Sequence, residues 1–391
     1  MIVGRRLSWR IILRYTGRPV AIHVLFALLI ALSYRHLELA WMAVPSLPVS
    51  VLAAALGVLL AFRNGSAYDR WWEARTIWGG VVNWSRTFAR QVLTLLPPPG
   101  DRGSTPLMEG PALTSRLLRT ATAPEAPGTL LTAAGTRGSD GAVRNQFGEA
   151  RAARAAREAR EARSASQPGA ALTDEALGPP QGVITGMSEG INEDARELVY
   201  AQMGFVNALR CHLRRQDPLP QLVPFFRPQV LEALRTEQNI PSALLLWMAT
   251  RLRHIYGQVS DAQKVVFLQV TMDGTLSELT NLLGACERIK NTSIPRQYDI
   301  LLLAMTRAYL AMLPLGVVAD LGWLTPVVTA VIAFLFIGLD AVGRDIEGPF
   351  EDDVSDTPMT ALCRTIEINL RQMLGETELP PPVQPQDGLL Y

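Results

Sequence analysis

Residues Leu47–Phe62 read LPVSVLAAALGVLLAF, and the chain continues to Trp78 as RNGSAYDRWWEARTIW. The first part has no charged residue, whereas the second has charges that can pair along one helix, namely Arg63, Arg70, Arg75, Asp69 and Glu73. A helix needs about 20 mostly apolar residues to cross a hydrocarbon core of about 30 Å, and tryptophan is enriched at the membrane boundary. The stretch therefore predicts a membrane helix that continues beyond the membrane as a charged helix.

Three further apolar runs lie outside this stretch, namely Val20–Tyr34, Ile300–Val318 and Leu321–Leu339. The last is long enough to span a membrane alone, and the others need flanking residues or protein neighbours. The run before it contains Arg307, which has two interpretations. Either the arginine lines an aqueous route or meets Asp299 or Asp340, or the membrane part begins later and the arginine reaches the interface. Pro314, with a glycine two residues later, favours a broken or re-entrant segment.

Arginines cluster on one side of the four runs, whereas the connection between the first two runs contains Arg35, His36 and Glu38. The clusters precede the first run, follow the second, precede the third and follow the fourth. By the positive-inside bias, both termini and the long central segment face the cytoplasm, so we expect a multi-pass protein of the inner (plasma) membrane. A signal peptide is disfavoured because no small-residue cleavage site follows the first run. A soluble all-α protein with buried helices is the alternative, but such helices rarely have one-sided arginine flanks.

Composition excludes several functional classes. The net charge of +1 over 391 residues shows no basic excess, so we expect no nucleic-acid partner. The three cysteines, Cys211, Cys286 and Cys363, lie far apart, which predicts reduced thiols rather than disulfides or a zinc module. No carboxylate, histidine or cysteine constellation suggests a catalytic or cofactor site, so we expect neither an enzyme nor a cofactor.

The long central segment divides by composition. Residues 97–190 are rich in Pro, Gly, Ser, Ala and Arg and are predicted to be a low-complexity, disordered insertion. Amphipathic patterns then predict helices over Asn192–Gln216, Ser242–Tyr256 and Ser260–Lys290. We expect five parts, namely 1–96 with the first two membrane helices, the insertion 97–190, a helical cytoplasmic domain 191–295, two further membrane helices in 296–345, and a cytoplasmic segment 346–391. The fold class is an all-α membrane protein with four membrane-embedded helices.

Three motifs together resemble the bestrophin family in its bacterial form. They are Phe62–Trp78, Gly284–Pro295 (GACERIKNTSIP) and Gly348–Asp356 (GPFEDDVSD). Each lies beside the apolar run where the family has it, and the three occur in the family's order. The resemblance covers about residues 5–96 and 192–375. It implies a homopentamer in a lipid bilayer that conducts small inorganic ions through a central pore.

The resemblance also implies which residues form the pore. In the family, the second membrane helix lines an apolar neck, and the matching positions here are Ala54, Val58 and Phe62. Their spacing of four residues independently predicts that they share one helical face. Five copies would form three apolar rings that oppose ion passage by dewetting. Because Ala54 and Val58 are smaller than is usual in the family, we expect a wider upper neck. Ordinary helix packing is the alternative role.

Two further sites follow from the resemblance. In the family, a second constriction lies on the helix before the Ser-Ile-Pro stretch. The matching position here falls near Phe267, and Val266 and Val270 are alternatives. The other interpretation is that Phe267 is a buried residue of the helix. Animal members hold Ca²⁺ with acidic residues that match Asp353 and Asp356. Gly348 replaces the family's asparagine there, which favours a solvated acidic loop instead.

The predicted function is therefore a bestrophin-type channel for small monovalent ions. Animal relatives conduct chloride and other anions, whereas some bacterial relatives conduct cations, and apolar rings do not choose between them. A non-conducting membrane scaffold and a transporter are the alternatives. Inverted repeats, which many transporters contain, are not visible in the four runs.

Overall fold

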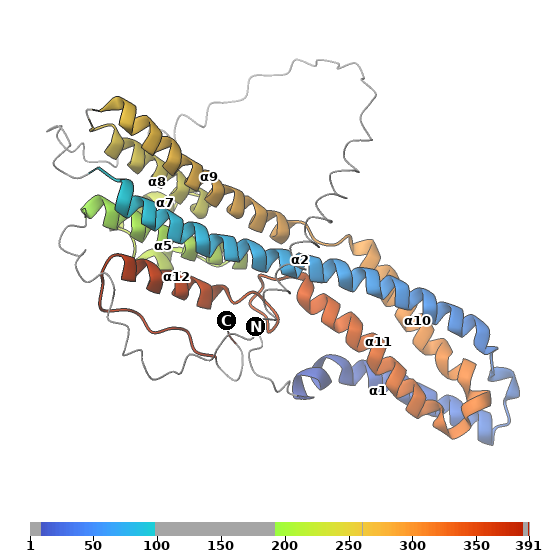
Figure 1. The fold of residues 1–391 in the computed structure, drawn as a ribbon. Coiled ribbons are helices and arrows are strands. Elements are labelled where there is room, and N and C mark those ends of the chain that lie inside the picture. Colours follow the sequence, from blue (N-terminus) through green and yellow to red (C-terminus); the bar gives the residue numbers. More distant parts are fainter. Residues whose placement is uncertain (1–8, 98–191, 260, 386–389, 391) are drawn as a thin grey trace, which may run out of the picture. The chain divides into compact units, whose positions relative to one another are not determined.

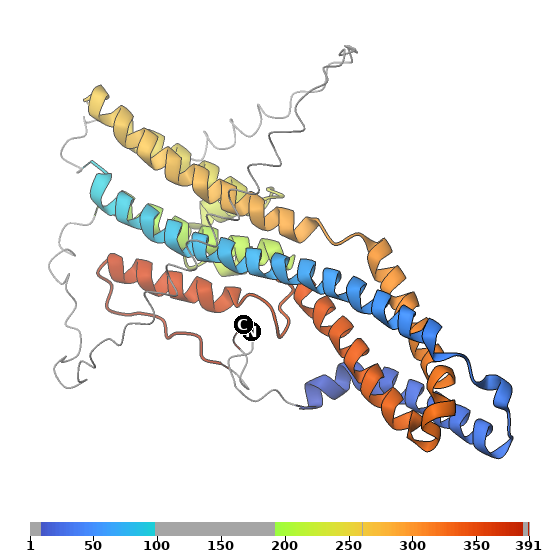
Figure 2. The same cartoon turned by 45° about the vertical axis from the view of Figure 1, so that its right-hand side comes forward.

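The computed structural model describes residues 9–97, 192–259, 261–385 and 390, so the predicted insertion at 97–190 lies, apart from Pro97, outside the described residues. Every regular element in the described part is a helix (Figures 1 and 2). The elements are α1 (Trp9–His36), η1 (Ala40–Met42), α2 (Ser46–Leu95), α5 (Glu193–Arg214), α6 (Leu219–Leu222), α7 (Pro228–Leu234), α8 (Ile240–Tyr256), α9 (Ala262–Asn291), α10 (Arg296–Leu321), η4 (Gly322–Leu324), α11 (Thr325–Glu347) and α12 (Met359–Met373). The all-helical prediction is confirmed for these residues.

Helix α2 organises the fold because it belongs to two separate cores. It runs without interruption for 50 residues, which at 1.5 Å per residue is about 75 Å, far more than a hydrocarbon core requires. Its first half packs against α10 and α11, and its second half packs against α5, α9 and α12. Figure 2 shows both sets of helices along the same continuous α2. One stiff helix thus connects the apolar half of the chain to the polar half.

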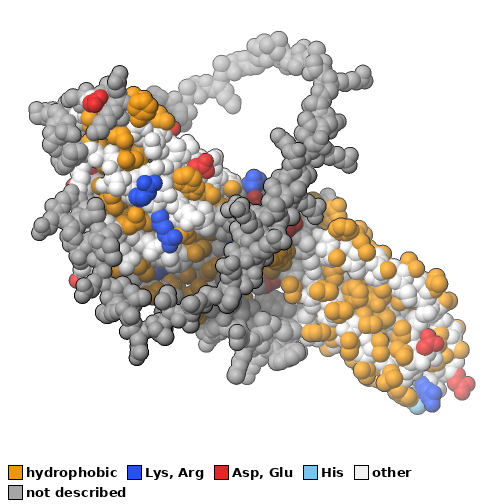
Figure 3. All heavy atoms as spheres, viewed as in Figure 1, with side chains coloured by type: hydrophobic (Ala, Val, Ile, Leu, Met, Phe, Trp, Pro, Cys, Tyr) orange, Lys and Arg blue, Asp and Glu red, His pale blue; other side chains and the backbone are white. Residues whose placement is uncertain are grey.

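The apolar half consists of α1, the first half of α2, α10 and α11. Three helical stretches are long and apolar enough to cross a membrane by length and composition, namely Thr16–His36, Ala40–Leu95 and Arg296–Glu347. The third contains two helices, α10 and α11, which pack against each other on either side of η4. Gly322 makes this reversal with a φ of +49°, which glycine adopts without a side-chain clash. Hydrophobic side chains cover the visible face of these helices in Figure 3.

Helix α10 is continuous across Pro314, so the prediction of a broken or re-entrant third segment is wrong. A proline lacks the N–H that would bond one turn back, but a helix tolerates this loss where neighbours support it. The chain at the start of α2 lies directly against this part of α10. The Val44 N–H donates to the Leu315 carbonyl at 3.1 Å, and a Cβ built on Gly316 would lie 2.7 Å from Val49 Cγ2. Proline and glycine therefore allow close helix packing here.

The polar half is built around α5, whose middle is almost fully buried between α2, α8 and α12. Asn192 caps its start by accepting the Asp194 N–H at 3.2 Å, and Arg215 ends it in the left-handed conformation. Asparagine favours the N-cap position, so the start agrees with the sequence, whereas the left-handed end usually has glycine and not arginine. The predicted helices over 192–216, 242–256 and 260–290 correspond to α5, α8 and α9, so these predictions are confirmed.

Candidate ion pathway along helix α2

One face of α2 is covered by no part of the described chain. Val58 is 56% exposed and Phe62 is 72% exposed, and Ala54 lies exposed on the same face. The opposite face is buried, with Leu56 at 0% and Leu60 at 2%. The structure therefore brings the three predicted neck residues onto one open stripe. Their role in a pore stays a prediction.

The open face changes character at Phe62. Toward the start of α2 it is apolar. Beyond Phe62 most of its exposed residues are small or polar, namely Gly65, Ser66, Asp69, Thr76, Gly79 and Asn83, with Trp72 48% exposed among them. A face turned to lipid along its whole length would have no reason to become polar in this way. The open face instead suits an aqueous path that narrows in the apolar part and widens beyond it.

Arg63 fixes the opposite side of α2 to the other membrane helices. Its side chain is 2% exposed and pairs with three carboxylates. The distances are 3.0 Å from Nε to Asp299 of α10, 3.4 Å from Nη1 to Asp340 of α11, and 3.3 Å from Nη2 to Glu347 of α11. A buried arginine stays charged and needs such partners. These four side chains are the Arg63 hub, and they hold α2, α10 and α11 in register.

The Arg63 hub corrects two predictions. Asp299 and Asp340 pair with Arg63 and not with Arg307, which is exposed on α10. The sequence also predicts that the charges after Phe62 pair along α2. Glu73 instead pairs with Arg288 of α9. Sequence spacing could not show this, because the partners lie more than 200 residues away and every distance depends on tertiary packing.

Arg70 and Trp71 hold the loops on either side of α2. Arg70 Nε donates to the Glu347 carbonyl at 2.8 Å, and its other nitrogens donate to the carbonyls of Ile289 and Thr292. Trp71 Nε1 donates to the Ser355 carbonyl at 2.7 Å. The two motif residues thus reach the Ser-Ile-Pro link between α9 and α10 and the acidic segment after α11. The three resembling motifs meet in space.

Several side chains of the acidic segment Gly348–Asp356 have partners within the protein. Glu351 pairs with Lys290 at 2.8 Å, and Asp352 pairs with Arg214. Asp356 is 3% exposed and accepts the Asp353 N–H at 3.0 Å, so it closes the segment's own turn. Burial raises the pKa of Asp356 to about 6. The described residues hold no group of three or more metal-binding side chains, and Asp353 with Asp356 does not fit a calcium shell of six to eight oxygens.

The second predicted constriction lies on α9. Phe267 is 77% exposed, and its neighbours Val266 and Val270 are 56% and 66% exposed. The interpretation of Phe267 as a buried helix residue is therefore wrong. Three large apolar side chains are thus uncovered at one end of α9. Such a group is seldom exposed to water, so a partner outside the described chain is expected to cover it. Their role as a constriction stays a prediction.

Comparison with known proteins identifies the family. A profile described as "Bacterial/Fungal Bestrophin protein" matches residues 7–125 and 181–372. The chain belongs to this bestrophin family. It is 26% identical over 342 residues to the "Voltage-dependent anion channel-forming protein YneE" of Escherichia coli, covering 86% of this chain and 80% of the relative. It is also 26% identical over 388 residues to the "Voltage-dependent anion channel-forming protein RSc3414" of Ralstonia nicotianae, covering 97% and 96% of the two chains.

The fold agrees with solved bestrophin structures. A bacterial bestrophin homolog from Klebsiella pneumoniae superposes with a TM-score of 0.62 at 22% identity, covering 92% of this chain and 98% of the other. At this identity the likeness concerns the fold alone. Together with the long apolar helices, the family match places this bestrophin in a membrane.

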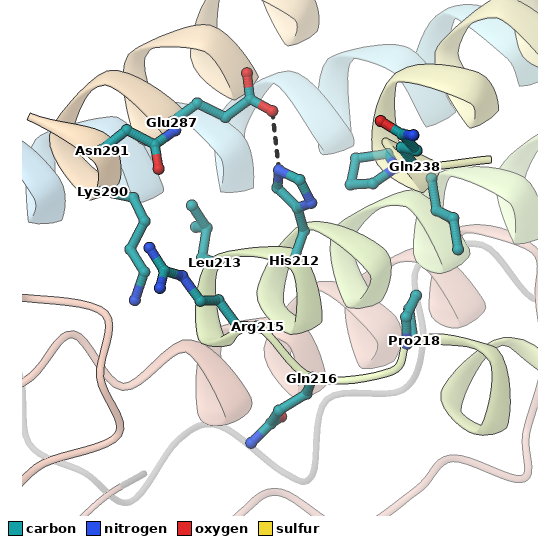
Figure 4. Close-up of a pocket in the computed structure, with 11 residues that line it drawn as sticks. His212, Leu213, Arg215, Gln216, Pro218, Gln238, Glu287, Lys290 and Asn291 are labelled. Atoms are coloured by element: carbon teal, nitrogen blue, oxygen red, sulfur yellow. Dashed lines mark hydrogen bonds and ion pairs between the residues drawn. The ribbon is translucent and has the colours of Figure 1, made fainter.

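This bestrophin also has a pocket of about 290 Å³ that the sequence did not reveal. In Figure 4, His212 of α5 points toward Glu287 of α9, at 2.9 Å from Nε2 to Oε1. The same Glu287 oxygen accepts a hydrogen bond from Asn239 at 2.7 Å. Two of the polar side chains at the wall, His212 and Glu287, thus bond to each other, and with Asn239 they join α5, the start of α8 and α9. Scattered histidines carried no sequence signal for such a contact.

Proposed function

We propose that this bestrophin is one subunit of a homopentameric channel that conducts small monovalent ions along the open face of α2. The observation that carries the proposal is that face itself, apolar up to Phe62, polar beyond it and uncovered by the described chain. Five α2 helices around one axis would cover it. The family match and the names of the channel-forming relatives support an ion channel rather than an enzyme.

In the proposed arrangement each subunit crosses the inner membrane four times, with α1, the first half of α2, α10 and α11. The second half of α2 and α12 share the polar core, which lies in the cytoplasm in this arrangement. With four crossings, the N-terminus lies on the same side. The division into five parts at 97, 191, 296 and 346 belongs to this proposal. The three apolar rings act by dewetting, since they offer an ion neither charge nor carbonyl oxygen.

Side-chain size in the neck makes the proposal testable. In proteoliposomes, the wild-type protein should release K⁺ or Cl⁻, and Val58→Phe should reduce the flux by narrowing the middle ring. The matched control is Val331→Phe, because Val331 of α11 is 64% exposed but lies away from the open face of α2. No flux of any small ion would favour the scaffold. A flux that saturates and is coupled to a second solute would favour a transporter.

A further inference from the structure

The first exposed charged side chain after Phe62, the last residue of the proposed neck, is an acid. Asp69 follows Phe62 by seven residues, close to two helical turns, and is exposed on the same face of α2. Over residues 47–83, the exposed Asp, Glu, Lys and Arg side chains of α2 are Asp69 and Glu73 alone. The apolar rings offer no charge, so the side chain that follows them decides the local electrostatic potential.

The other charges near this point already have partners. Glu73 pairs with Arg288. Arg63 is buried against its three carboxylates, and the Arg70 guanidinium bonds to carbonyl oxygens of the adjoining loops. Asp69 makes no hydrogen bond or ion pair with the part of the chain that the structure describes. Arg75 lies over the Trp71 ring at 4.8 Å and is half-buried. Among the described residues near the neck, Asp69 is therefore the exposed acid whose charge no partner offsets.

We infer that Asp69 sets the charge preference of the channel, and that it favours monovalent cations over anions. The inference rests on the proposed pentamer, in which five copies of Asp69 form a ring at the cytoplasmic end of the neck. Five carboxylates about one Debye length (~8–10 Å) from an ion change its local concentration by about threefold at physiological salt. The ring binds no ion tightly, because each carboxylate stays hydrated.

The test is the reversal potential of the full chain in a bilayer of uncharged lipid under an asymmetric KCl gradient. Asp69→Asn should lower the K⁺-to-Cl⁻ permeability ratio by about ninefold, because K⁺ loses a threefold enrichment and Cl⁻ loses a threefold depletion, and Asp69→Lys should lower it further. The wild-type ratio should also fall as salt rises, because salt screens the ring. The matched control is Glu232→Gln on α7, which removes an exposed acid outside the α2 face.

The outcomes separate the inference from the function on which it rests. A conducting Asp69→Asn channel with an unchanged permeability ratio overturns the inference alone. A wild-type chain that carries no ion overturns the channel and the inference together. If Asp69→Asn does not fold, Asp69→Ser gives the same neutralisation with a smaller side chain. A Glu232→Gln change as large as that of Asp69→Asn also overturns the inference, because the effect would then be one of net charge.

Discussion

Replacing Arg63 by methionine removes the buried charge of the hub but keeps a long side chain. The three carboxylates that surround it would then face one another without their shared partner. Arg344 still pairs with Asp340 at 2.8 Å, and Arg70 still lies near Glu347. Breaking a buried pair on one side costs about 3–5 kcal/mol. Since Arg344 remains, we expect the lower end, about 3 kcal/mol per subunit.

The assay is unfolding of the purified protein in detergent, followed by circular dichroism. The matched control is Arg288→Met, which breaks a pair whose side chains are 64% and 46% exposed and should cost at most about 1 kcal/mol. Neutralising the three carboxylates of the hub in the Arg63→Met background should restore most of the lost stability, because no unpaired charge then remains. Equal unfolding midpoints for the Arg63 and Arg288 variants would refute this reasoning.

Three further predictions follow from burial and packing. Because the pKa of Asp356 is raised by burial to about 6, its contribution to stability is full below about pH 4 and lost as pH rises through 6. Asp356→Asn should therefore match the wild type near pH 4 and exceed it by up to about 3 kcal/mol above pH 6, as unfolding at several pH values would measure. Gly316→Ala should destabilise by about 1–3 kcal/mol through a clash with α2, whereas the unobstructed Gly338→Ala should not; thermal unfolding separates them. The thiols of Cys286 and Cys363, whose pKa burial raises to about 12, should resist alkylation at pH 8 until denaturant is added, as mass spectrometry would show.

Apolar runs and amphipathic patterns were sufficient to predict the long helices α1, α2, α5, α8, α9, α10 and α11, but not the short helices. The continuation of α2 past Arg63 followed from charges and tryptophans at helical spacing, and the start of α5 followed from its capping residue. The prediction of a broken helix at Pro314 was wrong because a helix can stay continuous across a proline when a neighbouring element packs against it. Here that element is the start of α2, far away in the sequence.

The candidate site was predictable where it depends on one helix and unpredictable where it depends on several. Periodicity alone placed Ala54, Val58 and Phe62 on one face. The partners of Arg63 come from α10 and α11, and no local pattern connects them to it. The exposure of Asp69 likewise became visible only when the packing showed which neighbouring charges are already paired.

The central claim is that the open face of α2 lines the conducting path, and modification of a cysteine introduced there tests it most directly. The native cysteines are at most 3% exposed, so a charged thiol reagent should leave the wild-type current unchanged. We expect the same reagent to block Val58→Cys channels and to leave the current of Val331→Cys channels unchanged. Val58→Cys channels that are fully modified, as mass spectrometry would show, but conduct as before would contradict it.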